Sequence, residues 1–238
     1  MTMPVGGHPA AEPSPLPVRK LVAITVGLSL IWPAVSLMFS PITPGSYSDF
    51  FHDPLRLFLR AGVPMMCTAV VITLFLKRHG TFDRLWREPP SMPQPTWWMF
   101  AIAFIPAAAG AHGVVLQTIN LFQDKAAFVL ATVPTMLAVG YAEEIFFRGF
   151  LIDEMRRANV DEVKVAVISS ALFGLWHAPN FLVGTELVQL ITQLITTSIA
   201  GLAFYFIRRA TGLLWPGMLV HACFDMQAAA RFLAMGNG

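Results

Sequence analysis

Charged residues are scarce in this sequence. Lys, Arg, Asp and Glu make up 13% of the 238 residues, against about a quarter in soluble domains, while 55% are hydrophobic. The net charge of +2 is too small to indicate a nucleic-acid partner. The two cysteines, Cys67 and Cys223, exclude a disulfide framework and a cysteine-rich metal site, and both lie in apolar runs where we expect them to be buried. This composition predicts a membrane protein.

Long intervals without any charged residue predict membrane-spanning helices. Each interval approaches or exceeds the roughly 20 residues that an α-helix needs to cross a bilayer. The intervals are residues 21–48, 61–76, 89–123, 126–142, 165–185 and 187–207. Transmembrane β-barrels would instead show alternating segments of about ten residues. We therefore expect an all-α, polytopic membrane helix bundle of about seven transmembrane helices, near residues 21–39, 61–76, 97–116, 126–155, 163–182, 186–207 and 216–233.

The chain divides into four regions by composition. Residues 1–18 hold five prolines and predict a flexible tail without a cleavable signal. Residues 19–125 hold the first membrane helices and an interfacial or re-entrant segment at 40–60. Residues 126–232 form the helix bundle that concentrates the polar residues, and 233–238 form a short C-terminal tail.

The distribution of Lys and Arg predicts the orientation in the membrane. With a cytoplasmic N-terminus, four basic residues lie outside, namely Arg56, Arg60, Lys125 and Arg231. Eleven lie inside, namely Arg19, Lys20, Lys77, Arg78, Arg84, Arg87, Arg156, Arg157, Lys164, Arg208 and Arg209. Because cytoplasmic loops are enriched in Lys and Arg, this asymmetry favours a cytoplasmic N-terminus and an external C-terminus.

Ionisable residues inside the predicted spans indicate a functional site, since charges in hydrocarbon are costly. They are Glu143, Glu144, Arg148, His177, His221 and Asp225. At about 100° per residue, Glu144 and Arg148 share one ridge of a helix, whereas Glu143 points to a different sector. We expect Arg148 to neutralise Glu144 and Glu143 to act as a general base, the alternative being one purely structural charge network.

Two further helices bring histidines to the same depth. Pro179 removes a backbone donor close to His177 and should loosen the helix there. His221 and Asp225 lie one turn apart, so the carboxylate can orient the imidazole or share a ligand with it. A stripe of Gln189, Gln193, Thr197 and Gly201 is expected to serve helix packing. The convergence of these groups predicts a hydrolytic site below the membrane surface.

Three motifs resemble the signatures of the CAAX-protease and bacteriocin-processing (CPBP, or Abi) family. They are Glu143-Glu144-Ile-Phe-Phe-Arg148, Phe173-Gly-Leu-Trp-His177 and His221-Ala-Cys-Phe-Asp225. The resemblance covers about residues 126–232 and implies an intramembrane endopeptidase of the glutamate type. It implies that Glu143 and His177 activate water, while His221 and Asp225 stabilise the oxyanion. Prenyl-protein members carry Asn where this chain has Asp225, and an ionised Asp cannot donate a hydrogen bond.

Alternatives to this interpretation remain open. Glu143, His177, His221 and Asp225 could instead hold a zinc ion, although we favour chemistry without a cofactor because no His-Glu-x-x-His motif is present. The chain could be a non-proteolytic scaffold or bacteriocin-immunity protein, or a small transporter. Its expected location is a bacterial plasma membrane, with lipid and a membrane-associated protein or peptide substrate as partners.

Overall fold

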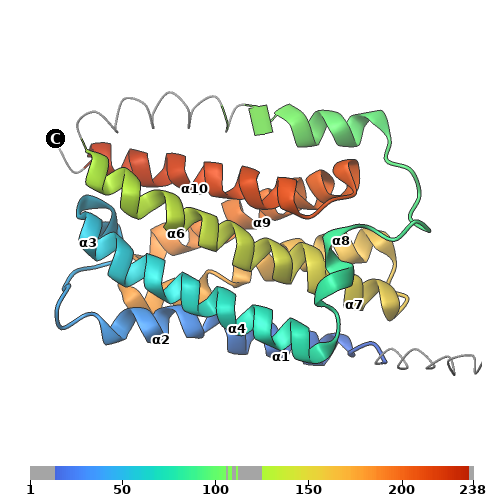
Figure 1. The fold of residues 1–238 in the computed structure, drawn as a ribbon, viewed down its shortest axis with the longest axis horizontal. Helices are drawn as coiled ribbons and strands as arrows, with labels where there is room; N and C mark the ends of the chain where they lie inside the picture. Colours follow the sequence, from blue (N-terminus) through green and yellow to red (C-terminus); the bar gives the residue numbers. More distant parts are fainter. Residues whose placement is uncertain (1–13, 106, 109–110, 112–124, 236–238) are drawn as a thin grey trace, which may run out of the picture.

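The computed structural model describes residues 14–105, 107–108, 111 and 125–235, and these residues build a helical bundle. Its named elements, in chain order, are α1 (Val18–Ser29), α2 (Ile31–Met38), η1 (Ser48–His52), α3 (Pro54–Leu57), η2 (Phe58–Gly62), α4 (Val63–His79), η3 (Phe82–Trp86), α6 (Ala126–Glu144), η4 (Ile145–Leu151), α7 (Ile152–Arg157), α8 (Glu162–Leu175), η5 (Ala178–Val183), α9 (Leu187–Thr211) and α10 (Trp215–Met235). Residues 97–105 are also helical. The long helices run back and forth along one axis, so α1 begins at one end of the bundle and α10 ends at the other (Figure 1).

The described helices confirm a polytopic helical membrane bundle. Five segments are long and apolar enough to cross a membrane, namely Val18–Met38, Pro54–His79, Ala126–Arg157, Glu162–Val183 and Leu187–Thr211. The predicted span at 97–116 falls partly outside the described residues, as do residues 1–13 and 236–238 of the predicted tails. The 21-residue α10 is not among these five segments, because polar side chains of the site lower its hydropathy. It runs beside α6 along the bundle (Figure 1).

The second span begins earlier than the sequence suggested. Asp53 Oδ1 accepts a hydrogen bond from the Arg56 backbone N–H at 2.7 Å, and Pro54 takes the first helical position, a favourable start for a helix. Arg60, which the sequence placed in an interfacial segment, lies inside this helical region and is buried in the bundle. Its side chain is 2% exposed, and it donates to the Ser36 hydroxyl at 3.1 Å and the Thr43 carbonyl at 2.7 Å. These partners satisfy the guanidinium inside the bundle.

The burial of Cys67 was also predicted wrongly. Its side chain is exposed on α4, on the same helix as the exposed Val70, Val71 and Leu74, while Cys223 is partly buried. An apolar run shows that a segment suits a membrane, but it does not show which face of the helix meets lipid.

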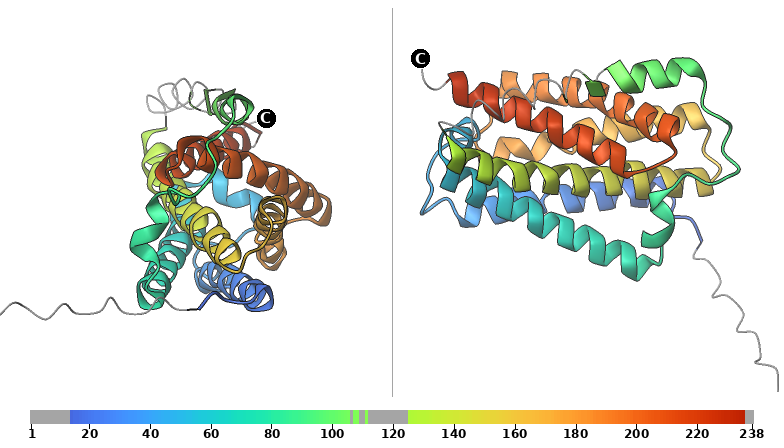
Figure 2. Two further views of the ribbon diagram at one scale, coloured as in Figure 1. Left: turned by 90° about the vertical axis from the view of Figure 1, so that its right-hand side faces the viewer. Right: turned by 45° about the horizontal axis from the view of Figure 1, so that its top comes forward.

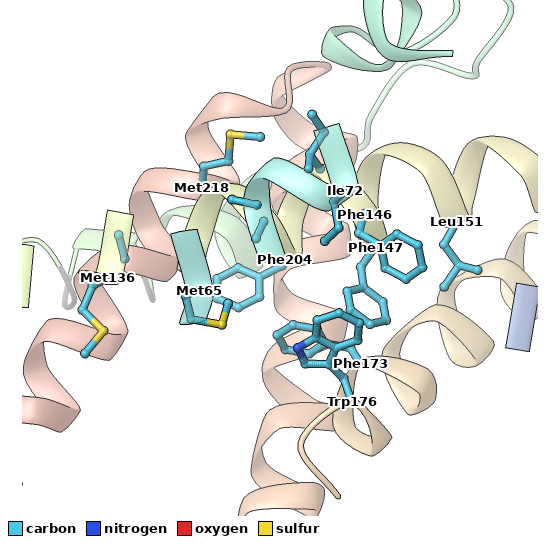
Figure 3. Packing of buried hydrophobic residues seen from close by; sticks show 14 of the residues in the cluster. Met65, Ile72, Met136, Phe146, Phe147, Leu151, Phe173, Trp176, Phe204 and Met218 are labelled. Carbon is cyan, nitrogen blue, oxygen red and sulfur yellow. The ribbon is translucent and has the colours of Figure 1, made fainter. Parts of the chain in front are cut away.

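Aromatic side chains fill the centre of the bundle. Phe147 contacts both Phe173 and Trp176 edge to face, with ring centroids 5.2 and 5.4 Å apart, and Phe146 also packs against Trp176, with centroids 5.8 Å apart (Figure 3). Edge-to-face packing is favourable for such rings beyond the area that they bury. This cluster packs η4 against α8, directly after Glu143 and Glu144 at the end of α6.

One end of the bundle is held by buried charge pairs. Glu88, in the segment after η3, pairs with Arg156 at 3.1 Å and with Arg209, and Arg208 Nε lies 4.0 Å from the same carboxylate. Arg208 also donates to the carbonyl of Trp86 at 3.1 Å. The three arginines lie near the ends of α7 and α9, so this Glu88 cluster connects those helices to the segment that precedes residues 97–105.

Close contact between α6 and α10 depends on Gly140. A methyl group at this position would meet the backbone carbonyl oxygen of Met218, which cannot move without shifting α10. We expect Gly140→Ala to destabilise the folded protein by about 1 to 3 kcal/mol through overpacking. Gly27→Ala is the matched control, because nothing lies within 4 Å of the methyl group that it adds. Thermal unfolding in detergent measures both, and equal melting temperatures would contradict the expectation.

Candidate active site

The first motif lies where α6 changes into a π-helical turn. Glu143 and Glu144 are the last two residues of α6, and η4 continues the same helix with the wider π geometry. π-helical turns are rare and frequent at functional sites. All seven residues of η4 are buried, so the turn is packed on every side and presents the glutamates from a fixed position.

Glu144 forms the predicted pair with Arg148. The Arg148 Nη1 and Glu144 Oε1 atoms are 2.9 Å apart, and both side chains are 1% exposed. Arg148 Nη2 also donates to the Gly201 carbonyl at 2.9 Å, and its guanidinium lies 4.1 Å from the Phe173 ring centroid. The guanidinium is thus fixed by a carboxylate, a carbonyl and an aromatic face, which is the arrangement of a structural support.

Glu143 has a different environment, with one engaged and one free oxygen. Its Oε1 accepts a hydrogen bond from Trp176 Nε1 at 3.1 Å. Its Oε2 is buried and has no hydrogen-bond partner, and it faces the Nε2 atoms of His177 at 4.0 Å and His221 at 3.6 Å. A buried unpaired carboxylate oxygen is unfavourable unless a further group binds there. The three side chains therefore converge on one buried polar position.

The second motif places His177 just beyond the end of α8. The helix ends at Leu175, and Pro179 starts the 3₁₀ turn η5, so the expected local loosening is a true helix end. His177 Nδ1 lies 3.0 Å from the Phe173 carbonyl oxygen. Because a carbonyl only accepts, Nδ1 carries a hydrogen, and the ring turns its Nε2 atom toward Glu143.

The third motif places His221 between two helices. Its Nδ1 is 3.1 Å from Glu144 Oε1, and its Nε2 is 3.5 Å from Asp225 Oδ2 on the next turn of α10. Phe204 stacks on the ring with centroids 4.7 Å apart. The carboxylates fix the ring in its plane and Phe204 covers one face, so Nε2 is directed at the free oxygen of Glu143.

A cavity of about 810 Å³ extends from these residues toward the loop between α2 and α3. Its wall includes Glu143, His177, His221 and Asp225 together with apolar side chains from several helices, among them Trp32, Met65, Met136 and Phe224. End-on, α4 and α9 lie on opposite sides of the bundle, and both contribute to this wall (Figure 2). The cavity wall is thus mostly apolar, with its ionisable groups gathered at Glu143, His177, His221 and Asp225.

The stripe on α9 has two roles, although the sequence suggested packing alone. Gln189, Gln193 and Thr197 line the cavity, whereas Gly201 packs so closely that an added methyl group would lie 3.1 Å from the Ser170 Cα and 3.3 Å from Arg148 Nη2. Asn180 Nδ2 donates to Gln193 Oε1 at 3.0 Å. The first three residues of the stripe therefore belong to the cavity wall, and Gly201 belongs to the contacts that hold Arg148.

Sequence reasoning missed two contributors to the site. The quoted second motif contains Trp176, but its role as the donor to Glu143 was not foreseen. Tyr47, from the loop between α2 and α3, also lines the cavity. Within the described part of the chain, no group of three or more His, Cys, Asp or Glu side chains is arranged to hold a metal ion.

Comparison with known proteins supports this assignment of motifs. Residues 125–227 match the family model described as Type II CAAX prenyl endopeptidase Rce1-like. This segment is similar to CAAX proteases. The match confirms the resemblance predicted from the three motifs, and all of their residues lie within it. No curated protein and no solved structure matches the chain.

The CAAX-protease-like segment runs from α6 into α10 and holds Glu143, Glu144, Arg148, His177, His221 and Asp225. Helices α1 to α4 lie outside the matched residues, yet Trp32, Tyr47 and Met65 from this part complete the cavity wall. The reactive groups and the cavity shape therefore come from different parts of the sequence.

Proposed function

We propose that this protein is an intramembrane endopeptidase that hydrolyses peptide bonds of membrane-associated proteins or peptides. The observation that carries the proposal is the free, buried Oε2 of Glu143, which faces the Nε2 atoms of two histidines beside a large cavity. This position suits a water molecule, since it offers a proton acceptor and neighbouring nitrogens at distances that one water can bridge.

In the proposed reaction, Glu143 removes a proton from water as the water oxygen attacks the scissile carbonyl carbon. His177, fixed by the Phe173 carbonyl, aligns the water through its Nε2 lone pair. The carbonyl π bond opens to give an oxyanion beside His221. The C–N bond then breaks, and the departing amine nitrogen receives the proton held by Glu143, which leaves a new carboxylic acid and a new amine.

The proposed chemistry needs no cofactor. Zinc is the alternative, with Glu143, His177, His221 and Asp225 as its ligands, because imidazole and carboxylate groups suit that ion. Activity of purified protein that persists through prolonged dialysis against a chelator supports the glutamate mechanism. Loss of activity with chelator and recovery on adding zinc would overturn it.

Mass spectrometry of new peptide termini tests the function itself. Membrane fractions from cells that express the wild-type protein should contain cleaved products that are missing when Glu143→Gln is expressed at the same abundance. A non-proteolytic scaffold or immunity protein would tolerate this substitution and give identical termini. The cavity's apolar wall favours substrates that reach the site from the bilayer, such as membrane-anchored proteins.

We also propose a cytoplasmic N-terminus in a bacterial plasma membrane. This orientation rests on the distribution of Lys and Arg along the sequence, eleven in the predicted internal segments against four in the external ones. A reporter fused after Gly238 is expected to give an external signal, and one fused after truncation at Arg209 a cytoplasmic signal. Cytoplasmic signals from both fusions would contradict this topology.

A further inference from the structure

Most serine and threonine hydroxyls on the cavity wall already donate their hydrogen. Thr135, Thr192, Thr196 and Thr197 line the cavity, and each donates to a carbonyl of its own helix at 2.7 to 2.9 Å. Ser29 does the same at 2.8 Å. A hydroxyl has one hydrogen, so these groups have none left for a ligand. The side-chain amides on this wall, by contrast, have both donors and acceptors to offer.

Asn180 and Gln193 form an amide pair next to the histidine of the second motif. Asn180 Nδ2 donates to Gln193 Oε1 at 3.0 Å, and the Asn180 backbone N–H donates to the His177 carbonyl oxygen at 3.0 Å. Asn180 is 7% exposed, and both amides line the cavity. The bond between them leaves the NH₂ group of Gln193 and the side-chain carbonyl oxygen of Asn180 for further bonds. The pair therefore complements the C=O and N–H groups of a peptide chain.

Gln189 continues this polar row along α9. It lies four residues before Gln193, lines the cavity, and makes no hydrogen bond through its amide within the part of the chain that the structure describes. Four residues of α-helix advance about 6 Å along the helix axis. Backbone groups on one side of an extended peptide recur every second residue, about 6.6 to 6.8 Å apart. The two glutamine amides are therefore spaced to meet every second residue of an extended chain.

The proposed reaction requires backbone partners of this kind. A substrate that stays helical keeps its carbonyl groups bonded inside the helix, so the segment around the scissile bond must unwind before water can attack. Unwound N–H and C=O groups are costly in an apolar cavity unless they find partners there. Trp32, Met65 and Phe224 on the other walls cannot provide such bonds, whereas the row of amides on α9 and η5 can.

We propose that Asn180, Gln189 and Gln193 bind the main chain of the substrate and hold it as an extended strand beside the catalytic groups. This inference rests on the proposed peptidase function and adds the form in which the substrate is bound. The glutamines contact alternate peptide groups, and Asn180 ties the row to the turn that carries His177. Because the row binds the backbone, the site tolerates different side chains and selects segments that unwind readily.

Gln193→Leu and Gln189→Leu test the row, since leucine has a similar size and no amide. The assay uses the full-length protein in detergent and a quenched fluorescent peptide that spans a cleavage site mapped by mass spectrometry. We expect each variant to raise KM by about tenfold, as for the loss of one buried hydrogen bond, with kcat within about threefold of wild type. Gln94→Leu is the matched control, because Gln94 is exposed and does not line the cavity, and both constants should stay unchanged.

Peptides methylated at single backbone nitrogens test the extended form in the wild-type protein. Each methyl group removes one N–H donor and leaves every side chain in place. The N–H groups of an extended strand point alternately to its two sides. We therefore expect KM to rise for methylation at every second residue near the cleavage site and to change little at the residues between. At the position that contacts Gln189, methylation and Gln189→Leu should not add, because both remove the same hydrogen bond.

Three results would overturn this proposal. The first is a KM that rises equally at consecutive methylated positions, or at none of them. The second is a wild-type KM in both leucine variants. The third is a fall in kcat alone in Gln193→Leu, which would assign the amide pair to the support of His177. If no peptide is cleaved, or if Glu143→Gln remains active, the peptidase function itself has failed and this inference fails with it.

Discussion

Glu143→Gln protein is expected to cleave peptide about 10²- to 10⁴-fold more slowly than wild type while it folds to the same extent. Glutamine has nearly the same volume as glutamate, and its side-chain oxygen can still accept the Trp176 hydrogen bond. It cannot take a proton from water, so the loss should appear in kcat as the loss of a general base. Turnover at saturating peptide measures the loss of catalysis, and thermal unfolding of the same sample measures any loss of stability.

The matched control for this experiment is Glu186→Gln. Glu186 precedes α9 and its side chain is exposed, away from the residues that line the cavity. Its substitution makes the same chemical change without touching Glu143, and it should leave turnover unchanged. Equal turnover of Glu143→Gln and wild type would remove the glutamate base from the mechanism.

Glu144→Gln should fail for a different reason, which is loss of stability. Arg148 is buried and its charge is paired with Glu144 at 2.9 Å, so removing the carboxylate leaves a buried guanidinium without its counter-charge. Breaking a buried pair on one side costs about 3 to 5 kcal/mol. We expect a large fall in folded protein and in melting temperature, with turnover per folded molecule reduced far less than in Glu143→Gln.

Asp153→Asn provides the comparison for Glu144→Gln. Asp153 pairs with Arg84 at 2.8 Å, but both side chains are partly exposed, at 20% and 26%. A solvent-accessible pair contributes at most about 1 kcal/mol. Similar destabilisation by the two substitutions, or equal loss of turnover per folded molecule in Glu143→Gln and Glu144→Gln, would refute the separate roles of the glutamates.

The sequence predicted the helical class, the Glu144–Arg148 pair and the convergence of three motifs because each depends on local spacing. Charge-free runs locate membrane helices, and residues four apart on a helix must be neighbours. The start of the second span was missed because Arg60 resembles an interfacial charge in sequence. Its partners, Ser36 and the Thr43 carbonyl, become neighbours only after the loop folds back.

The contributions of Trp176 and Tyr47 were missed for a related reason. Neither residue titrates near neutral pH, so a search for buried charge passes over them. Trp176 meets Glu143 across 33 residues of chain, and Tyr47 reaches the cavity from a loop outside the family match. Hydrogen-bond donors of this kind are visible only once the helices are placed against one another.

The Glu88 cluster has a mechanical consequence for a bundle that must admit a substrate. Arg156, Arg208 and Arg209 fasten the helix ends at the basic end, whereas the cavity extends toward the opposite end, near Tyr47 and Phe232. Helices that are fixed at one end and separated by a cavity at the other can move apart at the cavity end, with the charge cluster as the hinge. Entry of a substrate would then widen the half of the molecule near Tyr47 and Phe232 and leave the end held by the Glu88 cluster unchanged.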